Sequence, residues 1–213
     1  MKTRNIAVAA IAALLLCSCI PSVNPFFTGK DVVFDARLLG EWRAKEKSDD
    51  PALWKFEKGE TNYYKLTVTE EKGKQGQFEA RLFKLKDEFF LDLIPADCDY
   101  ATNQAGLVAA SMFPGHLLVR VSNLESGFHL MPPSEPELHL AFFDFDWLQK
   151  HLEKHPKALA HHNEGKGIVL TAETRELQAF VLKHLGEGEL FSKPTEMVRT
   201  NYPAPAARPA TQQ

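Results

Sequence analysis

The strongest constraint on the fold is a run of short β-forming stretches between residues 38 and 143. Turn signals such as Lys58-Gly59-Glu60 and Lys86-Asp87 separate neighbouring stretches, which is the pattern of an antiparallel meander. A closed up-and-down barrel of about eight strands accommodates this pattern, because closure removes exposed sheet edges. The expected strands are 38–43, 52–56, 63–69, 77–85, 88–94, 116–121, 127–130 and 137–143.

After residue 143 the spacing of hydrophobic residues changes from every second residue to about every 3.6 residues. This change predicts two helices that follow the barrel strands in the sequence. Asp146 and Gln149 have capping-box spacing at the start of the first helix, and Pro156 ends it. Thr171 is expected to cap the second helix, and 167–171 reads as a short strand between them. The predicted fold class is therefore mainly β (α+β), with an antiparallel barrel followed by two C-terminal helices.

The N-terminus carries the features of an export signal. A basic start precedes an apolar run of 11 residues, Ile6 to Leu16, which is too short to span a bilayer comfortably. The sequence Leu16-Cys17-Ser18-Cys19 that follows resembles the bacterial lipobox. The resemblance implies that residues 1–18 are a cleaved signal peptide, with a lipid on the Cys19 sulfur and an acyl chain on its new amino group. An ordinary secretory signal or an uncleaved anchor is the alternative.

Lipidation of Cys19 implies where the protein is located and which part of the chain lies next to the membrane. Several acyl chains give stable anchoring to a membrane, so the expected location is the cell envelope. Ile20 rather than Asp after the lipidated Cys favours the outer membrane, facing the periplasm or the cell exterior. We expect 19–33 to be the lipidated Cys and a tether, 34–192 a single domain, and 193–213 a disordered tail rich in Pro and Ala.

Charge and cysteine content argue against a nucleic-acid-binding protein and against an internal disulfide. Loss of residues 1–18 would leave 23 basic and 28 acidic residues, a net charge of −5, which argues against nucleic acid as a partner. Cys98 would then be the one cysteine without a lipid, so no internal disulfide is expected. Asp97 and Asp99 flank it, and their negative charges disfavour a reactive thiolate.

Gly40-Glu41-Trp42, on the first expected strand, resembles the G-x-W pattern of the lipocalin and calycin barrels. In those barrels the Trp packs across the closed end, and the family binds small apolar molecules inside. The sequence has no T-D-Y-like turn and no Arg after the last expected strand, since Arg175 lies in the helical region. The alternative is a solid barrel in which Trp42 is a core residue. The aromatics predicted to line the core or a cavity are Trp42, Trp54, Tyr64 and Phe90.

His151 and His155 are the weak candidates for a metal site. They lie four residues apart on a predicted helix, a spacing used by metal ligands. The alternative is an amphipathic helix with His151 beside Leu148 and Leu152. The sequence has no H-E-x-x-H, G-x-S-x-G, P-loop or G-x-G-x-x-G motif, so we expect a non-enzymatic protein without a cofactor or metal.

These observations predict a membrane-anchored bacterial lipoprotein that binds an apolar small molecule or lipid in its barrel. The alternative is a solid barrel with a structural role or a role in protein–protein interaction in the envelope. In that case the long connection 95–114 and the Pro-rich segment 131–136 would offer a docking surface. A metal-binding or hydrolytic enzyme is the third hypothesis.

Overall fold

The structure is a computed structural model that describes residues 20–46, 48–70, 73–96, 114–124, 136–163 and 167–200. The expected signal, Cys19, Cys98 and the expected strand 127–130 lie outside these residues. So do most of the two segments that were expected to offer a docking surface.

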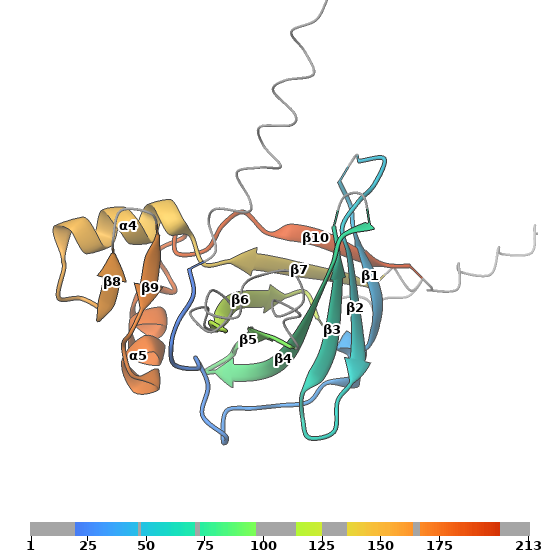
Figure 1. Cartoon of the computed structure of the whole chain (residues 1–213), viewed down its shortest axis with the longest axis horizontal. Helices are drawn as coiled ribbons and strands as arrows, with labels where there is room; N and C mark the ends of the chain where they lie inside the picture. Colours follow the sequence, from blue (N-terminus) through green and yellow to red (C-terminus); the bar gives the residue numbers. More distant parts are fainter. Residues whose placement is uncertain are drawn as a thin grey trace, which may run out of the picture.

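Eight antiparallel strands close into one barrel, in which each strand pairs with the next along the chain (Figure 1). The last strand closes the barrel by pairing with the first, so the predicted up-and-down topology is confirmed. The barrel strands are β1 (Gly40–Ala44), β2 (Leu53–Lys58), β3 (Tyr64–Thr69), β4 (Gln75–Leu85), β5 (Glu88–Pro95), β6 (Leu117–Ser122), β7 (Glu137–Phe142) and β10 (Thr195–Arg199).

The two predicted helices are present, and they stand between β7 and β10 together with a small hairpin. Figure 1 shows this group packed at one side of the barrel. Its elements are α4 (Phe145–Lys154), β8 (His161–Asn163), β9 (Ile168–Leu170) and α5 (Thr174–His184).

The helix caps differ from the predicted ones. Asp144, not Asp146, caps α4, because its extended backbone brings the carboxylate within 2.8 Å of the Trp147 N–H. Glu173, not Thr171, precedes α5 and forms a capping box with Glu176. In both cases a second polar residue, two positions away, was predicted as the cap instead of the residue that forms it.

The strand β10 corrects the predicted start of the tail at residue 193. Thr195–Arg199 pairs with β1 on one side and β7 on the other, so it belongs to the barrel wall. Only Met197 and Val198 are buried apolar residues within it, and Pro194 precedes it. Pairing on both edges stabilises this short strand, and a local hydrophobic pattern does not reveal that source of stability.

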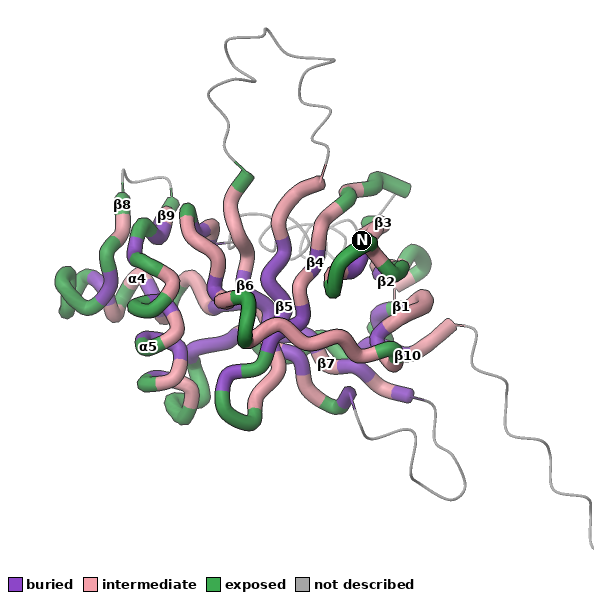
Figure 2. Tube along the Cα trace, turned by 90° about the horizontal axis from the view of Figure 1, so that it is seen from below, coloured by how far each residue is buried: buried purple, intermediate pink, exposed green. Residues whose placement is uncertain are grey.

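The barrel wall separates two hydrophobic cores. One fills the barrel interior, and the other lies between the outer face of the wall and the helices. Strand β5 shows the alternation: Leu91 and Leu93 belong to the inner core, while Phe90 belongs to the outer one. Figure 2 shows buried positions in the middle of the barrel strands and exposed ones in the connecting turns.

The end of the barrel next to β1 is closed by a short 3-10 helix, η1 (Ala36–Leu38). The indole Nε1 of Trp42 donates a hydrogen bond to the Leu38 carbonyl at 2.9 Å. The guanidinium carbon of Arg199 lies 5.5 Å from the centroid of the Trp42 ring, and Arg199 also donates to the Leu39 carbonyl. The last strand thus does supply an arginine against the Trp, which the sequence analysis missed because it placed Arg199 in the tail. The arrangement is consistent with a lipocalin-like barrel.

Replacement of Gly40 with alanine is expected to destabilise the protein by about 1–3 kcal/mol. Gly40 has φ +116°, and a Cβ added there would lie 2.9 Å from Arg199 Nη2, on a side chain that Trp42 and Leu39 hold in place. Urea denaturation followed by circular dichroism measures the loss. The control is Gly29→Ala, where an added Cβ would meet nothing within 4 Å. Equal stability of the two variants would contradict the close fit at the barrel end.

Candidate functional site

The barrel interior is the first candidate, because an apolar ligand would bind there. Trp42, Trp54 and Tyr64, three of the four aromatics singled out in the sequence, belong to the inner core. Tyr64 accepts a hydrogen bond from the Asp35 N–H at 2.7 Å and stacks on Phe34 at 5.0 Å. Burial raises the pKa of Tyr64 to about 12, so its hydroxyl stays protonated. Phe90 lies outside the barrel in the second core.

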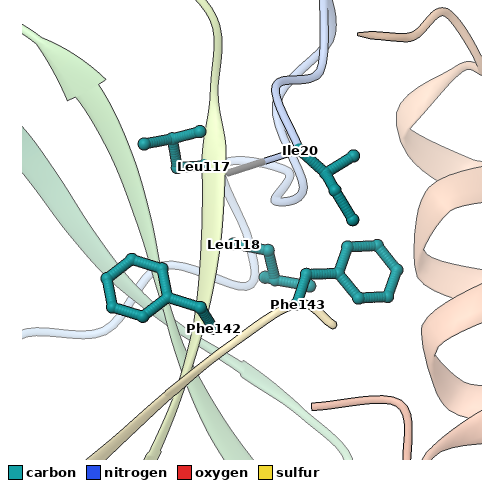
Figure 3. Close-up of a pocket in the computed structure, with 5 residues that line it drawn as sticks. All are labelled: Ile20, Leu117, Leu118, Phe142 and Phe143. Carbon is teal, nitrogen blue, oxygen red and sulfur yellow. The ribbon is translucent and has the colours of Figure 1, made fainter. Parts of the chain in front are cut away.

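The described interior is filled with side chains. The buried residues of the inner core are 0–8 % exposed, whereas residues that line a ligand-sized cavity would retain accessible surface. The hollow at the wall beside Ile20 is too tight to hold a water molecule (Figure 3). A groove of about 160 Å³ lies outside the barrel between Arg120 and Pro194, below the size range of small-molecule sites. The close packing of the described interior residues therefore favours a solid barrel over a hollow one.

The second candidate is the N-terminal segment, residues 20–28, which the sequence analysis assigned to a tether. The structure corrects this assignment, because the segment packs against the barrel and the helices from Ile20 onward. Ile20 lies against Leu118 and Phe143 in the outer core (Figure 3). Phe26 is also buried there and meets Phe143 edge-on, with ring centroids 6.5 Å apart. The tether prediction failed because Pro21 and Pro25 suggested a linker.

Backbone hydrogen bonds join the N-terminal segment to two separate elements. The backbone groups of Ser22 and His116 form two hydrogen bonds of 2.9 Å with each other. This antiparallel bridge attaches Ser22 to the chain just before β6. The Val23 N–H donates to the Leu170 carbonyl of β9, also at 2.9 Å. The segment therefore bridges the barrel wall and the small hairpin.

Asp92 fixes the N-terminal segment to the outer face of β5. Its Oδ2 accepts a hydrogen bond from the Phe26 N–H at 2.8 Å, and its Oδ1 lies 2.6 Å from His116 Nδ1. Asp92 is 2 % exposed, so both contacts are shielded from water. Buried polar groups require partners, and here each carboxylate oxygen has one.

Side chains of α5 hold the same segment from the other side. Thr174 donates to the Pro25 carbonyl at 2.7 Å, and Gln178 donates to the Phe26 carbonyl at 3.0 Å. These bonds satisfy carbonyls that the segment cannot satisfy by itself. The carbonyls of Pro25 and Phe26 are thus bonded to the helix and the Phe26 N–H to the barrel.

Ser22, His116 and Asp92 are the residue types of a hydrolytic triad, but their geometry serves the fold. Ser22 is fully buried, and its hydroxyl donates to the Asn24 carbonyl at 2.8 Å. A nucleophile must meet its substrate, and this hydroxyl is covered. The three residues attach the N-terminal segment to the domain.

The third candidate is the pair His151 and His155 on α4. Their ring centroids are 5.0 Å apart, and His184 of α5 lies 4.7 Å from His151. Trp147 stacks on His151 at 4.8 Å, so the imidazole packs among aromatic rings. Across the described part of the chain, no group of three or more His, Cys, Asp or Glu side chains is arranged to hold a metal ion. His184 was not among the predicted metal-site residues, because its approach to α4 is a tertiary contact.

Acidification is expected to destabilise the protein in part through His151. Burial, followed by the charges of His184 and His155, lowers its pKa from the ordinary 6.5, while Glu187 opposes the shift and Lys183 adds to it. The unfolded chain then binds more protons, so this contribution to stability is present above pH 6.5 and is lost as pH falls through the lowered pKa. His151→Gln should therefore lose less stability than the wild type between about pH 7 and pH 5.

Urea denaturation at each pH measures this difference, with His151→Asn as the control. This second neutral replacement also removes the partly buried imidazole, so it should show the same shallower pH profile. An unchanged profile for His151→Gln would show that His151 carries no such penalty.

Comparison with known proteins adds no family. No family model matches the sequence, and neither a curated protein nor a solved structure is significantly similar to it.

Proposed function

We propose that the protein is a lipid-anchored lipoprotein of the bacterial cell envelope whose solid barrel acts as a scaffold for contact with an envelope protein. The filled barrel interior is the observation that carries this proposal, because it favours the solid barrel over the ligand carrier. The lipobox Leu16 to Cys19 supports the anchor. Within the described residues, no helix is long and apolar enough to cross a membrane.

The described surface supports a partner that is recognised through polar contacts. Charged side chains cover it in pairs such as Lys45 with Glu137 and Arg120 with Glu88, both at 2.9 Å. Val23 is the one large hydrophobic side chain exposed among the described residues. Electrostatic complementarity then provides specificity more than buried apolar area does.

Solvent extraction and native mass spectrometry test the solid barrel. The chain beginning at Ile20 retains all eight strands and carries no acyl chains, so any extracted lipid must come from the fold itself. We expect a single mass, without a bound molecule and without a shift on addition of apolar probes. A stoichiometric apolar molecule released by solvent would restore the ligand-carrier hypothesis.

Crosslinking in intact cells tests the contact with an envelope protein. The full chain should give a recurrent protein neighbour, and reversal of surface charges at Arg120 and Lys45 should reduce its yield. Their partners Glu88 and Glu137 provide the matched charge-restoring variants. A chain that crosslinks to no protein would contradict the interaction role.

A further inference from the structure

We infer that the anchored domain lies directly on the bilayer surface, with the N-terminal segment and β9 turned toward the lipid headgroups. This inference rests on the proposed lipidation of Cys19. It adds a defined orientation of the barrel on the membrane, whereas a tether would leave the domain free to tumble.

No spacer separates the lipid attachment point from the folded domain. Ile20 follows Cys19 directly and is only 3 % exposed in the outer core. Consecutive Cα atoms lie about 3.8 Å apart, and the headgroup region on each side of a bilayer is roughly 5–8 Å thick. The protein surface around Ile20 therefore lies within reach of the headgroups when the acyl chains of Cys19 are inserted.

Backbone hydrogen bonds hold the N-terminal segment rigidly to the domain. Ser22 is bonded to His116 before β6, and Val23 is bonded to Leu170 of β9. These two connections run to different elements, so they hold residues 22 and 23 in one orientation on the domain and leave rotation only about the bonds that join Cys19 to Ile20. A lipid on Cys19 then limits both the distance of the domain from the membrane and the faces of the domain that can approach it.

The surface beside the anchor carries an exposed apolar side chain. Val23 is 51 % exposed and lies four residues from Cys19. An isolated apolar side chain beside a lipid attachment point contributes favourably where it meets the acyl boundary of a membrane. The side of the barrel formed by β2 and β3 lies away from β9 and α5 in Figure 1, and Glu60 in its turn is exposed to water.

Fluorescence quenching by lipids that carry a quencher tests the orientation on the full chain in vesicles. Val23→Cys and Glu60→Cys, each made in a Cys98→Ser background, carry a polarity-sensitive fluorophore. The lipid-borne quencher should reduce the fluorescence of the label at position 23 and leave the label at position 60 unchanged. Both positions are exposed, so circular dichroism should show an intact fold in each variant.

An inserted linker provides the matched control. About ten Gly and Ser residues between Cys19 and Ile20 would span up to roughly 35 Å and leave the contacts of Ile20 in place. The quenching at position 23 should be lost in this variant.

The mass of the N-terminal peptide separates the two levels of failure. An N-terminal peptide without lipid would refute both the anchor and the orientation. A lipidated protein that shows equal quenching at positions 23 and 60, or quenching at position 23 that the linker does not change, would refute the orientation alone.

Discussion

Asp92→Ala is expected to lower the free energy of unfolding by about 2–6 kcal/mol, because it leaves two donors without an acceptor at about 1–3 kcal/mol each. The change leaves the Phe26 N–H without its acceptor and His116 Nδ1 without its contact at 2.6 Å. Phe26 is buried, so water cannot reach its N–H without opening the structure, whereas the partly exposed His116 loses less. Urea denaturation followed by circular dichroism measures the effect.

Two further variants isolate the cause of this loss. Asp87→Ala removes a fully exposed carboxylate from the turn between β4 and β5 and should change stability by no more than about 0.5 kcal/mol. Asp92→Asn keeps one acceptor oxygen and should recover part of the loss. If Asp92→Ala were as stable as Asp87→Ala, the contact with Phe26 would not hold the segment to the barrel.

Trp42→Ala is expected to cost about 3–5 kcal/mol, because it empties the largest fully buried side chain of the inner core. It also removes the hydrogen bond to Leu38 and the ring on which Arg199 lies. The η1 helix and β10 would then lose their common contact at the barrel end. Thermal and urea unfolding should both report the loss.

Two further variants, Trp42→Phe and Trp147→Ala, separate the effect of side-chain volume from the effect of the position of the tryptophan. Trp42→Phe retains most of the buried ring and should be less destabilised than Trp42→Ala. Trp147 is a partly buried residue of α4 that packs on the outer core, so Trp147→Ala should cost less than Trp42→Ala. A larger loss for Trp147→Ala would place the main source of stability in the helices instead of the barrel.

The barrel was predictable because its strands carry local signals. Alternating apolar residues and short turns, which contain Gly59, Gly73 or Lys86-Asp87, marked β2 to β5, and their pairing in chain order follows from the short connections. The helices were predictable from the stripes of α4 and α5. Their first residues were not, since two polar residues that lie two positions apart competed for each cap.

The elements that complete the fold depend on tertiary contacts. β10 has two buried apolar residues, Met197 and Val198, and becomes a strand only because β1 and β7 present free edges to it. The N-terminal segment reads as a linker by its prolines, yet Asp92 and Gln178, far away in the sequence, supply its hydrogen-bond partners. No local pattern identifies such partners.

The residues of the candidate site were also only partly predictable from the sequence. Trp42, Trp54 and Tyr64 were recognisable as interior aromatics, but their packing decides between a hollow and a solid barrel. Arg199 was misplaced together with β10, and the contact of His184 with His151 arises from the packing of two helices. Residue types were predictable, and the distances between them were not.

Amide hydrogen exchange over residues 20–28 in the full, membrane-anchored chain tests the central claim most directly. The N–H groups of Ser22, Val23 and Phe26 donate to His116, Leu170 and Asp92. If the folded domain begins at the residue after Cys19, a peptide covering this segment should exchange about as slowly as one from β4 and β5. Exchange at the rate of an unstructured chain would show that the segment is a tether after all, and would remove the basis for a fixed orientation on the membrane.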